Sequence, residues 1–470
     1  MERHEVKEEL KLWEALIPII VTFAAILCME MPLLKGYKSI YVAFALGMAS
    51  TVAIGVLRLG VSLKEILKSV ISVIIELRRM LLAIVIISLL MGAWTISGII
   101  PAFIYYGVQT ISPAFCLVAI CLICVVMSFI TGSSQVTAAG VGVVLIAIAK
   151  GIGIPSSMAA GAVISGTSFG DKMSPLSFTT NLAAEAAGTD IKTHIKHMLY
   201  TTGVSLLIAL LFFAVLGASY TGEDLDSTRI NMMIYDIRED FYITPVLMIV
   251  PLVTVVAMMR KKYFIPSLII STILGIAIAI FVQKKEIMDV IMTMLGMGNT
   301  RILGGHYNWV GLFNMAQYTA RVGIAVIFGG LLEKLGILEA LAKKIVCRVK
   351  SIGALVTATM LTSIASNMAL GGKYLAIWTT GRMYKNEYER RSLATCNLSR
   401  CLEDAGTLIA PLIPWSITGV VIAECIGVPT IQYLPFCFLN IINPIISIIY
   451  GYTGVTIKET FDDRSLFESK

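Results

Sequence analysis

Charged residues are scarce in this chain. Asp, Glu, Lys and Arg together make up 14% of the 470 residues, against about 25% in soluble proteins, and apolar residues make up 57%. The mean hydropathy of +0.85 agrees with this composition. A water-soluble globular protein is therefore excluded, and the sequence predicts an all-α polytopic membrane protein, because helices satisfy their own backbone groups in lipid.

Histidine is also rare, with four residues in the chain and none in a predicted span. HExxH does not occur, and no His in a predicted span could act as the base of a membrane-embedded hydrolase that would use Asp171 and Ser174, which disfavours such an enzyme. We keep that enzyme only as a remote alternative. Cys121 and Cys124 form a CxxC without a second pair or a nearby His, so the nine cysteines predict packing, and we expect no cofactor.

Apolar runs of about 20 residues are plentiful and predict about 10–12 transmembrane helices. The expected spans are 12–34, 39–57, 80–104, 113–131, 198–219, 241–259, 263–282, 309–332, 351–370, 411–428 and 433–450, with a close-packed or broken helix in 132–165. Basic residues concentrate in 58–79, 260–262 and 343–350, whereas 221–240 is acidic. The positive-inside rule then predicts cytoplasmic termini and an external 221–240. Because Lys and Arg are spread over these loops, we expect lipid and no nucleic acid as partner.

Two halves of the chain share landmarks. Ser97-Gly98 resembles Leu335-Gly336, and Asp171 with its following Pro175 resembles Asp404 with its following prolines. We therefore predict a first transmembrane repeat at 1–220, an external linker at 221–240 and a second repeat at 241–470. Opposite starting sides for the two halves predict two inverted-topology repeats, whose discontinuous helices meet at the midplane.

The stretch 166–183 is polar, Gly-rich and interrupted by Pro175, although it lies within hydrophobic sequence. Irregular backbone survives at membrane depth only when it is buried in protein or lines a wet cavity, and an intramembrane carboxylate such as Asp171 suggests a functional site. The alternative is a loop outside the membrane in which Asp171 and Lys172 are solvated.

A set of polar residues from both halves is expected to bind the transported ion or substrate. These residues are Asp171, Ser174, Ser177, Thr179, Thr180, Asn181, Asn367, Lys373, Glu403, Asp404 and Thr407. Asp171 and Asp404 are the expected acids that take up a proton or a cation in turn, and a sodium ion would bind at these two residues.

Simpler roles are also open for two of these residues, Glu403 and Lys373, and for two histidines. Glu403 could be a helix end paired with Arg400, and Lys373 could extend from a span end to the interface. His194 and His197 sit among lysines and are typical of an interfacial basic loop, although a pH sensor is conceivable.

Several long strings carry a resemblance to a known family. They are GAWTISGIIPAFIYYG (92–107), TGSS (131–134), AGAVISGTSFGDKMSPLSFTTNLA (160–183), THIKHMLYTT (193–202), GRMYK (381–385) and NLSRCLEDAGTLIAPLIPW (397–415). Through them the chain resembles the NhaC family of sodium/proton antiporters, which includes malate/lactate exchangers. The resemblance implies a secondary transporter in the cell (inner) membrane. It also implies a conserved core at Asp171 and the following Ser/Thr/Asn run and at Glu403, Asp404 and Thr407.

The chain departs from the family pattern at three places. Phe178 and Gly372-Lys373 stand where the family usually has Asp and Asp-Gln, and Gln135-Val136 replaces Trp-Gly. Fewer carboxylates and an added lysine predict reduced sodium dependence, because an ammonium repels a cation. The expected function is exchange of a cation for protons. The alternative is a coupled exchanger of small organic acids or amino acids, and the candidate assembly is a homodimer.

Overall fold

The computed structural model describes residues 11–29, 39–110, 112–220, 227–258, 264–295, 324, 327–332, 335–337 and 349–460. In this part of the chain the backbone is helical and carries one isolated β-bridge, between Leu393 and Glu459. The expected span 309–332 and the basic segment 343–350 lie mostly outside the described residues. The elements that follow therefore come from both halves but do not include every expected span.

The helices of the first half are α1 (Leu12–Met29), α2 (Ser39–Leu57), α3 (Leu63–Ile96), α4 (Ile99–Thr110), α5 (Pro113–Thr131), α6 (Ser134–Thr137), the π-helix η1 (Ala138–Gly142), α7 (Val143–Gly151), α8 (Ser156–Met173), α9 (Phe178–Ala187) and α10 (Ile191–Ala218). After these come α11 (Ser227–Asp240), η2 (Pro245–Met248), α12 (Ile249–Met258), α13 (Phe264–Phe281), α14 (Ile287–Leu295), α17 (Ile352–Leu370), α18 (Lys373–Arg390), α19 (Thr395–Leu402), the π-helix η4 (Glu403–Thr407), η5 (Ala410–Leu412), α20 (Ile417–Ile426), α21 (Thr430–Tyr433), η6 (Leu434–Phe436) and α22 (Phe438–Thr453).

Local sequence fixes several of these boundaries. Helices α2, α5 and α17 coincide with the predicted spans, since each is a long apolar run. The basic segment 58–79, expected as a loop, is instead mostly helical: Ser62 caps α3 and forms a reciprocal capping box with Glu65. The acidic segment 221–240 likewise contains α11.

Four described helices are long and apolar enough to cross a membrane, and the number rises to six if each bent pair counts as one span. The four are Pro113–Thr131, Ser134–Gly151, Ile191–Ala218 and Ile352–Ala369, and the bent pairs join Thr395–Leu412 to Ile417–Ile426 and Thr430–Phe436 to Phe438–Thr453. The bends are 46° and 58°. The chain is thus a multi-pass helical membrane protein with interrupted spans.

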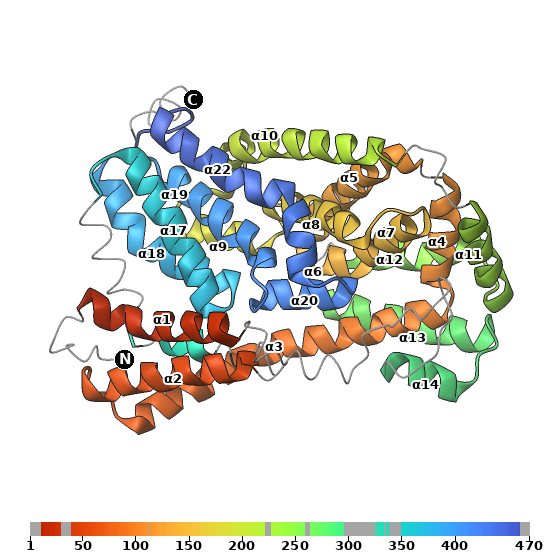
Figure 1. Cartoon of the computed structure of the whole chain (residues 1–470), viewed down its shortest axis with the longest axis horizontal. Helices are drawn as coiled ribbons and strands as arrows, with labels where there is room; N and C mark the ends of the chain where they lie inside the picture. The colour runs from red at the N-terminus through yellow and green to blue at the C-terminus, as the bar shows by residue number, and fades with distance from the viewer. Residues whose placement is uncertain are drawn as a thin grey trace.

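Helix α8 lies inside the molecule, with α5, α10 and α22 around it (Figure 1). It packs most closely on α5, because Gly166 and Gly170, four residues apart, let the two backbones approach. A Cβ atom added at Gly166 would lie 2.8 Å from Cys124 Cβ. Both glycines lie within regular helix, so the expectation that they form irregular backbone is wrong.

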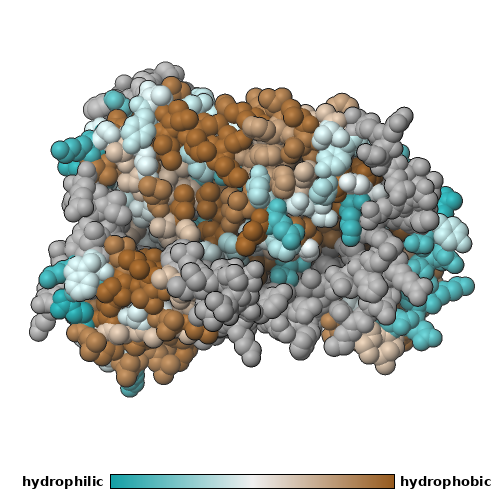
Figure 2. All heavy atoms as spheres, viewed as in Figure 1, coloured by the Kyte–Doolittle hydropathy of each residue, from teal (hydrophilic) through white to brown (hydrophobic). Residues whose placement is uncertain are grey.

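The outer surface over α10 and α22 is apolar. Figure 2 shows hydrophobic side chains across the upper face, where Figure 1 places α10. Leu207, Leu211 and Val215 of α10 are each more than 60% exposed. Large apolar patches of this kind on a polytopic protein suit contact with lipid.

The local backbone of residues 128–188 recurs later in the chain. Positive φ angles at Gly132, Gly153 and Gly188 recur at Gly371, Ser392 and Gly427, a constant separation of 239 residues. Helices α8 and α9 start at residues 156 and 178, and α19 and α20 start at 395 and 417, with the same separation. The landmark pair Gly98 and Gly336 also has positive φ at both positions.

This recurrence supports the predicted repeat but changes its register. At a separation of 239, Asp404 corresponds to Ser165, and Asp171 corresponds to Ala410. The predicted equivalence of Asp171 with Asp404 is therefore wrong: the acids lie about two helical turns apart along corresponding helices. The inverted orientation of the second half and the three-part division of the chain stay predictions.

Candidate functional site

The predicted break in 166–183 is short. Helix α8 ends at Met173, and α9 begins at Phe178 after the turn Ser174–Ser177, in which Pro175 cannot continue a helix. Asp171 and Lys172 stand in the last turn of α8 and are 2% and 0% exposed. The alternative of a solvated loop is therefore wrong, and the break presents both charges to the protein interior.

Asp171 has a complete set of partners. Ser177 Oγ donates to its Oδ1 at 2.6 Å, and Ser134 Oγ donates to its Oδ2 at 2.8 Å. The Nζ atom of Lys373, which is 3% exposed, lies 2.9 Å from the same Oδ2. Lys373 therefore does not extend to the interface, and it neutralises Asp171 within the protein.

Two copies of one backbone turn deliver these partners. After α5, Gly132 has φ 64° and Ser133 is extended with φ −153°; after α17, Gly371 has φ 64° and Gly372 is extended with φ −155°. The next residue, the first of α6 or α18, is Ser134 in one copy and Lys373 in the other. Corresponding positions of the repeat thus place a hydroxyl and an ammonium on the same carboxylate oxygen.

Asp404 is held by residues from both halves of the chain. Lys172 of α8 forms an ion pair with Asp404 Oδ1, and both side chains are completely buried. Asn443 Nδ2 donates to the same oxygen at 2.7 Å, and Thr201 Oγ1 lies at 3.4 Å. Each of these two acids is therefore paired with a lysine from the other half of the chain: Lys172 pairs with Asp404, and Lys373 pairs with Asp171.

The segment Glu403–Thr407, which contains Asp404, is a π-helical turn, η4. The bend comes later, between Leu412 and Ile417. Asn367 Nδ2 of α17 donates to the carbonyl oxygen of Gly406 at 2.5 Å and holds the turn against that helix. π-Helical turns occur frequently at functional sites because they displace one residue from the regular hydrogen-bond pattern.

Glu403 differs from its neighbour Asp404. It is 0% exposed, and neither carboxylate oxygen has a hydrogen-bond partner among the described residues. The alternative of a helix-end pair with Arg400 is wrong, because Arg400 Nη1 donates to Thr456 Oγ1 at 2.6 Å and no ion pair joins it to Glu403. A buried carboxylate without a partner is costly, by several kcal/mol on general grounds.

The remaining predicted residues support the break. Thr180 Oγ1 donates to the carbonyl of Lys172 at 2.9 Å, and Asn181 Nδ2 donates to that of Ser177 at 2.6 Å. Thr179 Oγ1 lies 3.0 Å from Ser177 Oγ. Ser174 Oγ accepts the N–H of Leu176 at 3.2 Å, an arrangement that stabilises a turn and gives a hydrolase no activated nucleophile.

Several site residues were not found from the sequence. Ser134 lies in the TGSS string, but only the fold brings it to Asp171, and Asn443 is an amide within an apolar run, which could have been a signal. His194 and His197, expected in an interfacial loop, are buried in α10 at 0% and 1% exposure. Their ring nitrogens have no partner among the described residues.

Phe178 and Lys373, two of the residues that differ from the family pattern, both lie next to Tyr374. The ring of Phe178 packs edge-on against Tyr374, with centroids 5.1 Å apart, and Lys373 Nζ lies 5.7 Å from the centre of the Tyr374 ring. Phe178 is 59% exposed. A carboxylate at position 178 would therefore stand beside Tyr374 on the more open side of this cluster.

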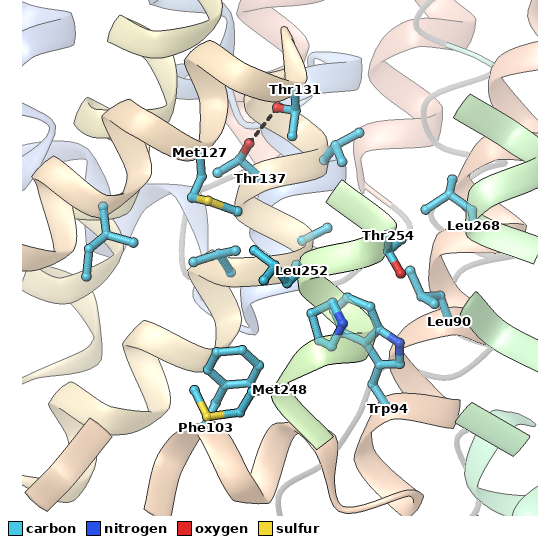
Figure 3. Close-up of a pocket in the computed structure, with 16 residues that line it drawn as sticks. Leu90, Trp94, Phe103, Met127, Thr131, Thr137, Met248, Leu252, Thr254 and Leu268 are labelled. Atoms are coloured by element: carbon cyan, nitrogen blue, oxygen red, sulfur yellow. Dashed lines mark hydrogen bonds between the residues drawn. The ribbon is translucent and has the colours of Figure 1, made fainter. Parts of the chain in front are cut away.

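A separate cavity of about 330 Å³ lies between α3, α5, η1 and α12 (Figure 3). Its wall is almost entirely apolar, with Trp94, Met127 and Leu252 among the labelled residues, and the Thr131 and Thr137 hydroxyls on its rim are 2.9 Å apart. None of its lining residues is titratable at ordinary pH. Its chemistry suits an apolar chain and not an ion.

Comparison with known proteins places the chain among transporters. Residues 166–455 match the profile of the Na+/H+ antiporter family. The Na(+)/H(+) antiporter NhaC of Bacillus subtilis is 38% identical over 401 residues, 84% of this chain and 88% of that protein. NhaC of Alkalihalophilus pseudofirmus is 35% identical over 376 residues, 79% and 81% of the two chains. The malate-2H(+)/Na(+)-lactate antiporter of B. subtilis is 32% identical over 452 residues, 94% and 95% of the two chains.

Proposed function

The chain belongs to the Na+/H+ antiporter family, and we propose that it exchanges Na+ for protons across the cell membrane through the buried acid–lysine cluster. The cluster comprises Asp171, Lys172, Lys373, Glu403 and Asp404. One observation carries the proposal: three carboxylates and two lysines from both halves are buried together beside helix breaks. Acids in such a position can bind a proton or a cation, and each ion then drives out the other.

Proteoliposomes containing the purified protein test this function. A proton gradient should drive Na+ uptake against its own gradient, and added Na+ should dissipate the proton gradient. Asp404→Asn keeps the size of the side chain but removes its charge, so exchange should fall by at least about tenfold, a loss of about 1.4 kcal/mol or more. Thr272→Val, a change at a buried hydroxyl of α13, is the matched control. Downhill Na+ flux without proton movement would contradict the proposal and indicate a channel.

A second candidate is exchange of small organic acids or amino acids with reduced sodium dependence. It is favoured by Lys373, whose ammonium occupies the Oδ2 side of Asp171, where a cation would otherwise bind. The relative named as a malate-2H(+)/Na(+)-lactate antiporter makes organic acids a reasonable substrate class to test. Uptake of labelled malate or lactate with Na+ replaced by choline separates the candidates, because only the second would proceed at full rate.

The orientation of the protein and its assembly belong to the same proposal. We expect both termini in the cytoplasm, 221–240 outside, and a homodimer. The charge pattern of the loops supports the orientation.

A further inference from the structure

Glu403 is the one acid of the cluster for which the described residues provide no counter-ion contact. Asp171 has Lys373 and Asp404 has Lys172, whereas both Glu403 oxygens are buried and without a hydrogen-bond partner. The two lysines of the cluster are each paired with another acid, Lys172 with Asp404 and Lys373 with Asp171. A carboxylate in this position needs a ligand of positive charge, which is either a proton or a cation.

Other oxygens without a hydrogen-bond partner lie on η4 itself and on α17, which packs against it. Thr407, one turn after Glu403, has a buried hydroxyl without a partner, and so does Ser363 of α17. The side-chain oxygen Oδ1 of Asn367 also has no hydrogen-bond partner, while the Nδ2 of the same side chain donates to the carbonyl oxygen of Gly406. A Cβ atom added at Gly406 would lie 3.0 Å from Ser363 Oγ, so α17 and η4 approach closely here.

This composition matches one ligand class. Carboxylate, hydroxyl and amide oxygens are hard donors, and they suit a small hard cation better than a soft metal. Among the described residues no three His, Cys, Asp or Glu side chains gather as a metal-binding group. A single carboxylate with neutral oxygens therefore favours a monovalent cation.

Asp171 is a poorer candidate. Its Oδ1 accepts from Ser177, and its Oδ2 accepts from both Ser134 and Lys373. A cation that entered there would have to displace an ammonium. Asp404 Oδ1 is engaged by Lys172 and Asn443, which leaves only Oδ2 without a partner.

We propose that Glu403, together with Thr407, Asn367 and Ser363, forms the site at which Na+ and a proton compete, and that the two acid–lysine pairs hold the helix breaks in place around it. This inference rests on the proposed Na+/H+ exchange and names the site of that exchange. In this arrangement the ammonium of Lys373 is a permanent counter-ion of Asp171, and the exchangeable cation binds at Glu403.

Thermal unfolding of the purified full-length protein in detergent tests the site, with NaCl replaced stepwise by choline chloride. Na+ should raise the Tm of the unmodified protein in a saturable way, because a ligand that binds the native state stabilises it. The Na+ concentration for half of this effect should rise about tenfold for each unit of pH decrease in the range where the proton competes, as expected when one proton and one cation share one carboxylate.

Glu403→Gln should abolish the Na+ effect and its pH dependence. Thr407→Val keeps the shape of the side chain and should raise the half-saturating Na+ concentration about tenfold, the loss expected for one polar ligand. Thr272→Val is the control and should keep the Na+-dependent rise in Tm of the unmodified protein. If Glu403→Gln does not fold, Thr407→Val still decides the question.

The inference is overturned if Glu403→Gln or Thr407→Val responds to Na+ as the unmodified protein does. It is also overturned if the unmodified protein shows no Na+-dependent rise in Tm. Failure of the proposed function would be recognised separately, because proteoliposomes would then show no coupled movement of Na+ and protons.

Discussion

The ion pair between Lys172 and Asp404 gives the sharpest test of how the two halves are joined. Both side chains are 0% exposed, and when the lysine is removed Asp404 keeps Asn443 and Thr201 as neutral partners in the described part of the chain. Removing one partner of a buried pair leaves an uncompensated charge and costs about 3–5 kcal/mol. Lys172→Met and Asp404→Asn should each lower the apparent Tm by about 6–10 °C, using about 2 °C per kcal/mol for a large domain.

The double variant Lys172→Met/Asp404→Asn should be more stable than either single variant, because it removes both charges. The assay is the fraction of monodisperse protein after heating in detergent, measured by size-exclusion chromatography at one heating rate, since membrane proteins often unfold irreversibly. Arg390→Met is the matched control: Arg390 is 72% exposed in its pair with Glu387, so its loss should cost at most about 1 kcal/mol. Additive effects of the two buried substitutions would refute the reasoning.

Three further outcomes are expected. The double variant Lys373→Gln/Gly372→Asp removes an ammonium and adds a carboxylate, so it should raise the dependence of exchange on Na+. The structure can accept the aspartate, because the backbone of Gly372 is extended and a Cβ atom there would have Ile417 at 3.3 Å as its near neighbour. An unchanged Na+ dependence in proteoliposomes would contradict this prediction. Gly170→Ala should destabilise the protein by about 1–3 kcal/mol in the same heating assay, because its Cβ would lie 2.7 Å from Ser128 Cβ, whereas Gly140→Ala meets open space and should be neutral. On a cysteine-free background, a thiol at Glu239→Cys should react with an impermeant maleimide from outside and one at Lys350→Cys should not; the reverse pattern would reject the proposed orientation.

The sequence by itself determined the elements of this protein that depend on local physics. Long apolar runs set α2, α5 and α17 almost to the residue, because a span needs about 20 residues without charge. Pro175 and the polar residues around it located the helix break. The improbable presence of Asp171 and Asp404 in apolar sequence singled them out as site candidates.

Only the tertiary structure decided how those candidates are paired. Spacing along the chain cannot show that Lys172 reaches Asp404, 232 residues away, or that Ser134 and Lys373 meet on Asp171. The repeat was visible in the sequence, but its register was not, because the residues that match at a separation of 239, such as Pro175 with Pro414 and Ser177 with Ser416, are few and scattered, and the backbone angles show the register most clearly.

The distinction between Glu403 and Asp404 is likewise a tertiary one. The two acids are neighbours in the sequence, which favoured Asp404 as the exchanging acid and left for Glu403 the alternative of a pair with Arg400. In the π-helical turn Asp404 contacts Lys172 and Asn443, whereas neither carboxylate oxygen of Glu403 has a hydrogen-bond partner among the described residues. Adjacent helical residues face different directions, so their partners depend on which helices the fold places on each side.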